Sequence, residues 1–261
     1  MYPHHQEAIE QMMAYFKAID GVIAVILGGS VSKGTERADS DIDGMIVVTP
    51  ELYAAQAAKN ALAETIHGIC SYPGGYFDVK YYTKDYLQDA ADHGSEPQRN
   101  AYLCSRVLYT LDPEITDIVA RIPIFQKNEK QEKLAVFYAS LMMNYHYFWN
   151  LRGENKFIEV RTATEIVYAA YRLILQENEI LFPCNRNMQN YVENAPRKPR
   201  NITQLGDIFF RTLAHEDCKR FVEAVDSWTS YQPENEKLGQ TKYVEYYELW
   251  WKNPRPFVNE W

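Results

Sequence analysis

The chain has 261 residues, 46% of them hydrophobic, and a formal net charge of −8 at pH 7. This length allows one large domain or two of ordinary size, and the hydrophobic content can fill a substantial core. The acidic balance weighs against long nucleic acids as partners, because proteins that bind them usually present a basic face, but it does not exclude a local basic pocket.

Two further features restrict the class of protein. No run approaches the roughly 18 apolar residues of a membrane span, so no membrane partner is expected. The four cysteines lie far apart without metal-site spacing, which favours reduced thiols and a cytoplasmic location. They are Cys70, Cys104, Cys184 and Cys218.

The first half of the chain alternates strand and helix patterns. Short β-branched runs bounded by glycine and proline indicate strands, and apolar residues at helical spacing indicate helices. We expect an amphipathic helix within 1–20, strands over 21–27, 41–48, 76–83 and 105–111, and helices over 50–67 and 112–122.

The pattern changes at the charged segment 125–133, where we place a domain boundary. Apolar residues then recur at helical spacing, and a loop interrupted by prolines is expected over 182–201. Strands followed by helices predict an α/β domain followed by a helical bundle. The expected apolar helix faces are Leu134, Phe137, Tyr138, Leu141, Tyr145 and Phe148, then Ile166, Val167, Ala170, Leu173 and Ile174, then Leu205, Ile208, Phe209, Leu213, Phe221, Val222 and Val225.

The stretch "LGGSVSKGTERADSDIDGMIVV", residues 27–48, joins the first two expected strands. Gly28 and Gly29 allow positive φ and a close approach to the backbone, and Ser30 begins a short turn or helix. Lys33 and Arg37 add positive charge, so this turn suits a polyphosphate. Glycine-rich turns are common, however, and alone they indicate little.

Three aspartates follow the glycine turn at alternating positions. Because strand side chains alternate between faces, Asp41 and Asp43 share a face, and Ile42 between them can enter a core. Asp39 has the same parity, but Ser40 is no core residue, so Asp39 is assigned to the loop. Two carboxylates on one strand face suit Mg²⁺, which also binds substrate phosphates.

A third carboxylate is expected on a neighbouring strand. Asp78 lies between Phe77 and Val79 in an otherwise apolar strand, and Lys80 shares its face. Asp78 is therefore assigned to the metal site, with a buried Asp78–Lys80 pair or an edge-strand charge as the alternative.

The run "GGSVSKGTERADSDID" resembles the signature of the DNA polymerase β nucleotidyltransferase superfamily, especially that of small bacterial antibiotic-modifying enzymes. The resemblance covers about residues 1–122. The helical half is more weakly similar to the substrate-binding bundle of aminoglycoside- and lincosamide-type nucleotidyltransferases. It implies an α+β protein, with a mixed-sheet catalytic domain over 1–124 and an all-α substrate-binding domain over 125–261.

The resemblance also implies roles for individual residues. Gly28, Gly29, Ser30 and Lys33 would bind the nucleotide. Asp41 and Asp43 would bind two Mg²⁺ ions, and Asp78 would be a third ligand or the base. The expected substrates are ATP or another nucleoside triphosphate as donor and a small molecule with a hydroxyl group as acceptor. An antibiotic is one such acceptor. The alternatives are a regulatory or toxin–antitoxin-type module acting on a protein or RNA, and a nucleotide-binding module without turnover.

Three other features of the helical half have open interpretations. Glu165 follows Thr162 by three residues, which favours a capping box over a general base. His146 is expected to be a partly buried structural histidine, with a catalytic role as the alternative. The basic segment Arg186, Arg197, Lys198 and Arg200 is expected to be a solvated loop, with an anion site as the alternative.

Overall fold

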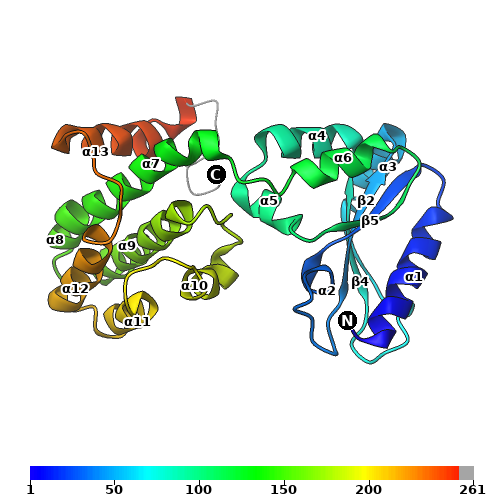
Figure 1. The fold of residues 1–261 in the computed structure, drawn as a ribbon, viewed down its shortest axis with the longest axis horizontal. Helices are drawn as coiled ribbons and strands as arrows, with labels where there is room; N and C mark the ends of the chain where they lie inside the picture. The colour runs from blue at the N-terminus through cyan, green and yellow to red at the C-terminus, as the bar shows by residue number, and fades with distance from the viewer. Residues whose placement is uncertain (253–261) are drawn as a thin grey trace. The chain divides into compact units, whose positions relative to one another are not determined.

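The structure is a computed structural model that describes residues 1–252, and at Glu236 the backbone alone. The chain divides into two compact units, Met1–Ile124 and Phe125–Trp261. Each unit has its own hydrophobic core, and each is described here by itself (Figure 1).

A five-stranded mixed sheet forms the centre of the N-terminal unit. The strands are β1 (Val22–Leu27), β2 (Ile42–Val48), β3 (Ala63–Ile66), β4 (Phe77–Tyr82) and β5 (Arg106–Thr110), in the spatial order β3-β4-β2-β1-β5. β2 and β4 are parallel, and the other neighbouring pairs are antiparallel. The sheet with its helices, followed by a helical unit, confirms the predicted α+β class.

Helices cover both faces of this sheet. They are α1 (Pro3–Lys17), α2 (Gly29–Lys33), α3 (Pro50–Ala58), α4 (Lys84–His93), α5 (Glu96–Ala101) and α6 (Glu114–Arg121). On one face, α1 buries Met12 and Phe16 against strand residues such as Ile46. On the other face, α4 and α6 pack on Met45 and Val47. β2 therefore sends even-numbered side chains toward α1 and odd-numbered ones toward the opposite face.

The prediction of one helix over 50–67 is wrong. α3 begins at the expected proline, with Thr49 accepting a hydrogen bond from the Leu52 amide at 3.3 Å, but it ends at Ala58. Asn60 then takes a positive φ of 55°, which turns the chain into β3 at the sheet edge. The alanine-rich composition favours helix locally, but pairing of β3 with β4 decides the outcome. The helices α4 and α5 were not predicted.

The second unit is helical. Its elements are η1 (Lys127–Glu129), α7 (Lys130–Met143), the π-helical turn η2 (Asn144–Phe148), α8 (Trp149–Leu151), α9 (Lys156–Glu177), α10 (Asn185–Glu193), α11 (Ile202–Thr212), α12 (His215–Asp226), α13 (Glu236–Tyr243), the π-helical turn η3 (Val244–Glu248) and η4 (Trp250–Lys252). Most residues of the three predicted apolar faces pack into one core that is rich in α9 side chains, and Phe148 and Ile208 lie outside it. Across residues 1–252, every helix is too short or too polar to cross a membrane.

Two predictions for this unit need correction. The segment 182–201 is not simply a loop, because the nine-residue helix α10 lies within it with Met188 and Val192 buried. The third apolar face belongs to two helices, since Leu213 adopts a positive φ of 49° and separates α11 from α12.

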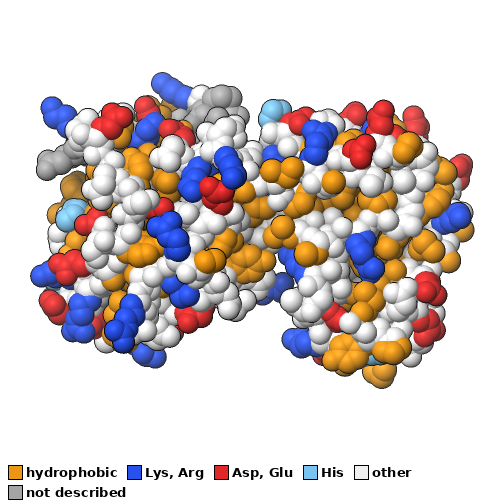
Figure 2. All heavy atoms as spheres, viewed as in Figure 1, with side chains coloured by type: hydrophobic (Ala, Val, Ile, Leu, Met, Phe, Trp, Pro, Cys, Tyr) orange, Lys and Arg blue, Asp and Glu red, His pale blue; other side chains and the backbone are white. Residues whose placement is uncertain are grey.

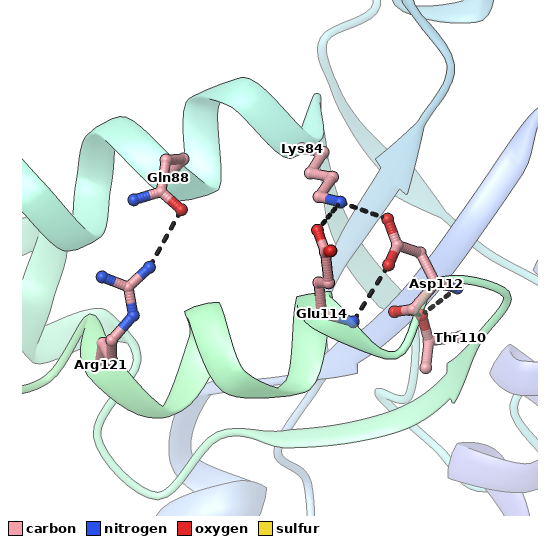
Figure 3. A network of polar contacts seen from close by, with 6 residues as sticks. All are labelled: Lys84, Gln88, Thr110, Asp112, Glu114 and Arg121. Carbon is pink, nitrogen blue, oxygen red and sulfur yellow. Dashed lines mark hydrogen bonds and ion pairs between the residues drawn. The ribbon is translucent and has the colours of Figure 1, made fainter.

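A polar network joins α4 to the start of α6 in the N-terminal unit (Figure 3). The Lys84 ammonium lies 2.5 Å from Asp112 Oδ2 and 2.6 Å from Glu114 Oε2. Asp112 Oδ1 also accepts a hydrogen bond from the Glu114 amide at 3.0 Å. These contacts lower the pKa of Asp112, chiefly through the hydrogen bond from Lys84, and raise that of Lys84.

Replacing this lysine, Lys84→Met, is expected to lower the melting temperature modestly and to change its pH dependence. Because the pKa of Asp112 is lowered in the folded state, its ionised carboxylate stabilises the fold at pH values above the unfolded pKa near 3.8. This stabilisation is lost as pH falls through the folded pKa. Melting curves of both proteins should therefore differ most near neutral pH and converge in acid. Lys59→Met, at an exposed position, is the matched control. An identical difference at neutral and acid pH would contradict the role of the pair.

Candidate active site

Asp41, Asp43 and Asp78 come together at one end of the central strands. Asp41 directly precedes β2, Asp43 lies within it, and Asp78 lies in β4. The parallel register places Asp43 and Asp78 opposite each other. One carboxylate oxygen from each of the three residues lies within 4.8 Å of the other two.

The alternation of β2 explains why two of these acids share a face. Ile42 is fully buried between them and packs in the core beside α1, while Asp41 and Asp43 are only partly buried. Asp39 lies outside the group, since it is exposed and pairs with Arg37 at 3.1 Å. Lys80 is exposed, which is inconsistent with a buried pair between Lys80 and Asp78.

The acidic group carries an electrostatic cost. Burial raises the pKa of Asp43 to about 6, and the charges of Asp41 and Asp78 act in the same direction. The cations of Lys80 and Lys33 oppose this rise. At neutral pH the three carboxylates therefore repel one another where water screens them only in part. A bound divalent cation would relieve this repulsion.

Gly29 at the start of α2 packs directly on this group. Its φ is +65°, and a Cβ built there would lie 1.6 Å from Asp43 Oδ2. A side chain at this position would therefore occupy the place of the Asp43 carboxylate. The Gly28 amide also donates to the Asp43 carbonyl at 3.0 Å, so the glycine turn and β2 hold each other in register.

The acidic group and the glycine turn lie in a part of the chain that resembles a known family. Residues 9–99 match the family model described as a nucleotidyltransferase domain. The match covers the glycine turn and all three aspartates, and it ends within α5. The match lies within the N-terminal unit, and the helical unit lies outside the matched range.

Other comparisons add little. No curated protein gives a significant match. Among solved structures, the chain is similar to a nucleotidyltransferase-like protein from Exiguobacterium sibiricum 255-15, with 9% sequence identity and a TM-score of 0.48. That alignment covers 96% of this chain and 81% of the other. Nothing about activity follows from a likeness at this level.

Ser30 and Lys33 lie on α2, within the range that the family model matches. The Ser30 carbonyl accepts a hydrogen bond from the Thr35 amide at 3.0 Å, which closes the short helix. Lys33 Nζ donates to Asn100 Oδ1 at 3.1 Å, so α5 helps to place this cation near the acids. Ser32 also donates through its hydroxyl to the Cys104 carbonyl, and this contact ties α2 to the segment after α5.

Tyr76 is a site residue that the sequence analysis missed. Its hydroxyl forms a hydrogen bond with Asp41, and this bond is the main reason that the pKa of Tyr76 is raised. The Ile42 amide donates to the Tyr76 carbonyl at 3.0 Å, and Ile42 pairs with Phe77 in the parallel register. Tyr76 therefore stands beside Asp41 as Asp78 stands beside Asp43, a relation that only strand pairing reveals.

The remaining candidates lie in the helical unit. Thr162 and Glu165 do not form a capping box, because α9 begins at Lys156, where Asn155 accepts hydrogen bonds from the Phe157 and Ile158 amides. Glu165 instead pairs with Arg161 one turn earlier. His146 is exposed in η2, so the expectation of a partly buried histidine is wrong. In the basic segment, Arg186, Arg197 and Arg200 are exposed and Lys198 is partly buried.

The aspartate group fits a divalent metal ion. It offers three carboxylates, which are hard oxygen ligands of the kind that Mg²⁺ takes together with substrate phosphates. The pKa of Asp43 is raised first by burial and then by the charges of Asp41 and Asp78, and a bound cation would oppose both effects. When bound, divalent ions would neutralise charge on a triphosphate and hold its oxygens in place.

Proposed function

We propose that the protein transfers a nucleoside monophosphate, most simply AMP from ATP, to a hydroxyl group of a small molecule in a Mg²⁺-dependent reaction. One observation carries the proposal. Asp41, Asp43 and Asp78 converge beside a glycine turn within the range that matches a nucleotidyltransferase domain. The acids would hold the metal ions, and the turn would hold the phosphates.

The proposed chemistry balances as an in-line displacement. The acceptor oxygen forms a bond to the α-phosphorus, and the bond from that phosphorus to the bridging oxygen of the β-phosphate breaks, so pyrophosphate leaves. The hydroxyl proton passes to Asp78 or to solvent. In such a reaction the protein mainly positions the groups and stabilises developing charge.

The residues of the N-terminal unit would divide these tasks. Asp41 and Asp43 would be metal ligands, and Asp78 a ligand, a base or both. The backbone of Gly28 and Gly29, the Ser30 hydroxyl and the Lys33 ammonium would contact phosphates. We assign acceptor recognition to the helical unit, which the family model does not cover.

The small-molecule acceptor is favoured over a long nucleic acid by charge. The chain carries 35 acidic and 27 basic residues. On the face shown in Figure 2, Lys and Arg side chains are interspersed with Asp and Glu over each unit. Backbone-directed nucleic acid binding instead requires many cations acting together on phosphates.

The direct test is a transfer screen. The full chain is incubated with Mg²⁺ and each of the four nucleoside triphosphates, labelled at the α-phosphate, in the presence of antibiotic and metabolite pools. Label should move to a small molecule with one equivalent of pyrophosphate released. Asp39→Asn, which removes one negative charge from an exposed position outside the acidic group, should transfer label as the wild type does. Hydrolysis without any labelled acceptor, or transfer that persists in EDTA, would contradict the proposal.

A further substitution, Asp78→Asn, tests the division of tasks once an acceptor is known. Asparagine keeps the shape but can neither accept the hydroxyl proton nor ligate with charge, so transfer should fall at least about 100-fold. Binding of the nucleotide with Mg²⁺, measured by calorimetry on the same sample, should weaken far less. Unchanged transfer would mean that the base lies elsewhere.

A further inference from the structure

The helical unit contains a pocket that the nucleotide site does not use. Its volume is about 260 Å³, close to the lower end of the roughly 300–1,000 Å³ typical of small-molecule sites. It is lined by residues of η2, α9, α13 and η3, among them Phe148, Phe157, Arg161, Glu165, Tyr243 and Tyr247. This pocket lies outside the range that matches the nucleotidyltransferase domain.

Both π-helical turns of the unit contribute to the lining. η2 supplies Asn144 and Phe148, and η3 supplies Tyr247. A π-helical turn inserts one extra residue into a helix and is frequently found at functional sites, because it redirects the side chains around it. Two such turns, a hundred residues apart in sequence, direct aromatic rings into the same pocket.

Aromatic rings form much of the wall. Tyr243 and Tyr247 are stacked, with ring centroids 4.9 Å apart and an interplanar angle of 14°. Phe148 lies against Tyr243 at 5.8 Å. Phe157, which also lines the pocket, is 72% exposed, an unusual state for so large an apolar side chain. Ring faces carry partial negative charge and attract cations.

The charged pair in the wall is asymmetric. Arg161 Nε lies 3.1 Å from Glu165 Oε1, but the arginine side chain is 65% exposed and the glutamate side chain only 22%. Solvent screens the guanidinium more than the carboxylate, so a ligand inside the pocket would feel the carboxylate more strongly than the guanidinium. The pKa of Tyr243 is raised by burial and then by the charges of Glu248 and Glu165, and the charge of Arg161 opposes this rise.

We propose that this pocket binds a small organic cation, an ammonium group carried on an apolar or aromatic body. The ammonium would lie between the Glu165 carboxylate and the rings of Tyr243 and Tyr247, and the body would contact Phe148 and Phe157. Among the described residues, Glu165 pairs with Arg161 through Oε1, and Oε2 would face the ligand. The proposal is independent of nucleotide transfer.

The test uses three probes of similar shape and different charge: benzylamine, which is a cation at pH 7.5, benzyl alcohol and benzoate. Their dissociation constants are measured by NMR titration of the full chain. Benzylamine should bind most tightly and benzoate most weakly. Equal affinity for benzylamine and benzoate, or no binding of any probe, would overturn the proposal.

Matched variants locate the interaction. Glu165→Gln should weaken benzylamine binding at least about fivefold and leave benzyl alcohol binding unchanged. Glu154→Gln removes the same charge from an exposed position and should change neither. Tyr243→Phe keeps the ring face and should retain binding, while Tyr243→Leu should lose it. A Glu165→Gln protein that melts like wild type and binds benzylamine equally well would contradict the assignment.

The outcome is separable from that of the nucleotide proposal. Asp43→Asn alters the acidic group of the other unit and should leave benzylamine binding unchanged. A pocket that binds the cation in a protein without transfer activity would refute only the proposed function. A protein that transfers nucleotide but ignores the cation would refute only this inference.

Discussion

Asp43→Asn should remove nucleotide transfer while making the metal-free protein more stable. Loss of one carboxylate from the group of three should reduce the transfer rate at least about 1,000-fold, or about 4 kcal/mol of transition-state stabilisation. Rates at saturating Mg²⁺ provide the measurement, with Asp39→Asn as the charge-matched control. Near-wild-type turnover in Asp43→Asn would exclude Asp43 as a ligand.

The stability part of this prediction follows from the raised pKa of Asp43. Its folded pKa of about 6 exceeds the ordinary value of 3.8, so the folded state binds the proton more strongly than the unfolded state. The contribution of Asp43 therefore destabilises the metal-free protein above pH 6, and the effect disappears as pH falls toward 4.

The size of this effect can be bounded. The difference between 6 and 3.8 is about 2 pH units, which corresponds to at most about 3 kcal/mol, and solvent at the partly exposed carboxylate reduces it. In EDTA at pH 7.5, Asp43→Asn should melt at a higher temperature than wild type, and the two should converge near pH 4. A lower melting temperature at pH 7.5 would show that the carboxylate stabilises the fold.

Gly29→Ala should disrupt the site far more than an equivalent change at Gly34. Both glycines have left-handed backbones, with φ of +65° and +69°. A non-glycine residue pays about 1–2 kcal/mol in that conformation, so both variants should lose similar stability from the backbone. A Cβ at Gly34 meets nothing within 4 Å, whereas one at Gly29 would overlap the Asp43 carboxylate.

The expected result is a separation of stability from function. Gly34→Ala should retain transfer at close to the wild-type rate with a modest loss in melting temperature. Gly29→Ala should lose at least about 100-fold in transfer, because either the Asp43 side chain or α2 must move. Equal activity of the two variants would mean that the packing of Gly29 against Asp43 does not matter for the reaction.

The sheet and its acidic group were predictable because their signals are local. β1 is a β-branched run bounded by glycines, β2 ends in an apolar run, and the alternation of Asp41, Ile42 and Asp43 fixes which side chains face the core. Asp78 was recognisable as a lone acid in an apolar strand. Its position opposite Asp43 was not, because the parallel register depends on a chain segment more than thirty residues away.

The errors arose where tertiary contacts outweigh local patterns. The Thr162–Glu165 spacing is a helix-start pattern, but both residues lie inside α9, where Thr162 is buried and Glu165 pairs with Arg161. The edge strand β3 forms from a helix-favouring sequence because β4 offers it hydrogen bonds. No local sequence pattern predicts that Tyr76 and Asn100 lie at the site, because their partners Asp41 and Lys33 are distant in the chain.

The most direct test of a metal-dependent nucleotide site at Asp41, Asp43 and Asp78 is calorimetric binding of nucleoside triphosphates, with Mg²⁺ and with EDTA. Wild type and Asp39→Asn should bind at least one triphosphate at least about tenfold more tightly with Mg²⁺ than with EDTA, and Asp43→Asn should lose this difference in affinity. A Mg²⁺ advantage that is unchanged in Asp43→Asn would contradict the account.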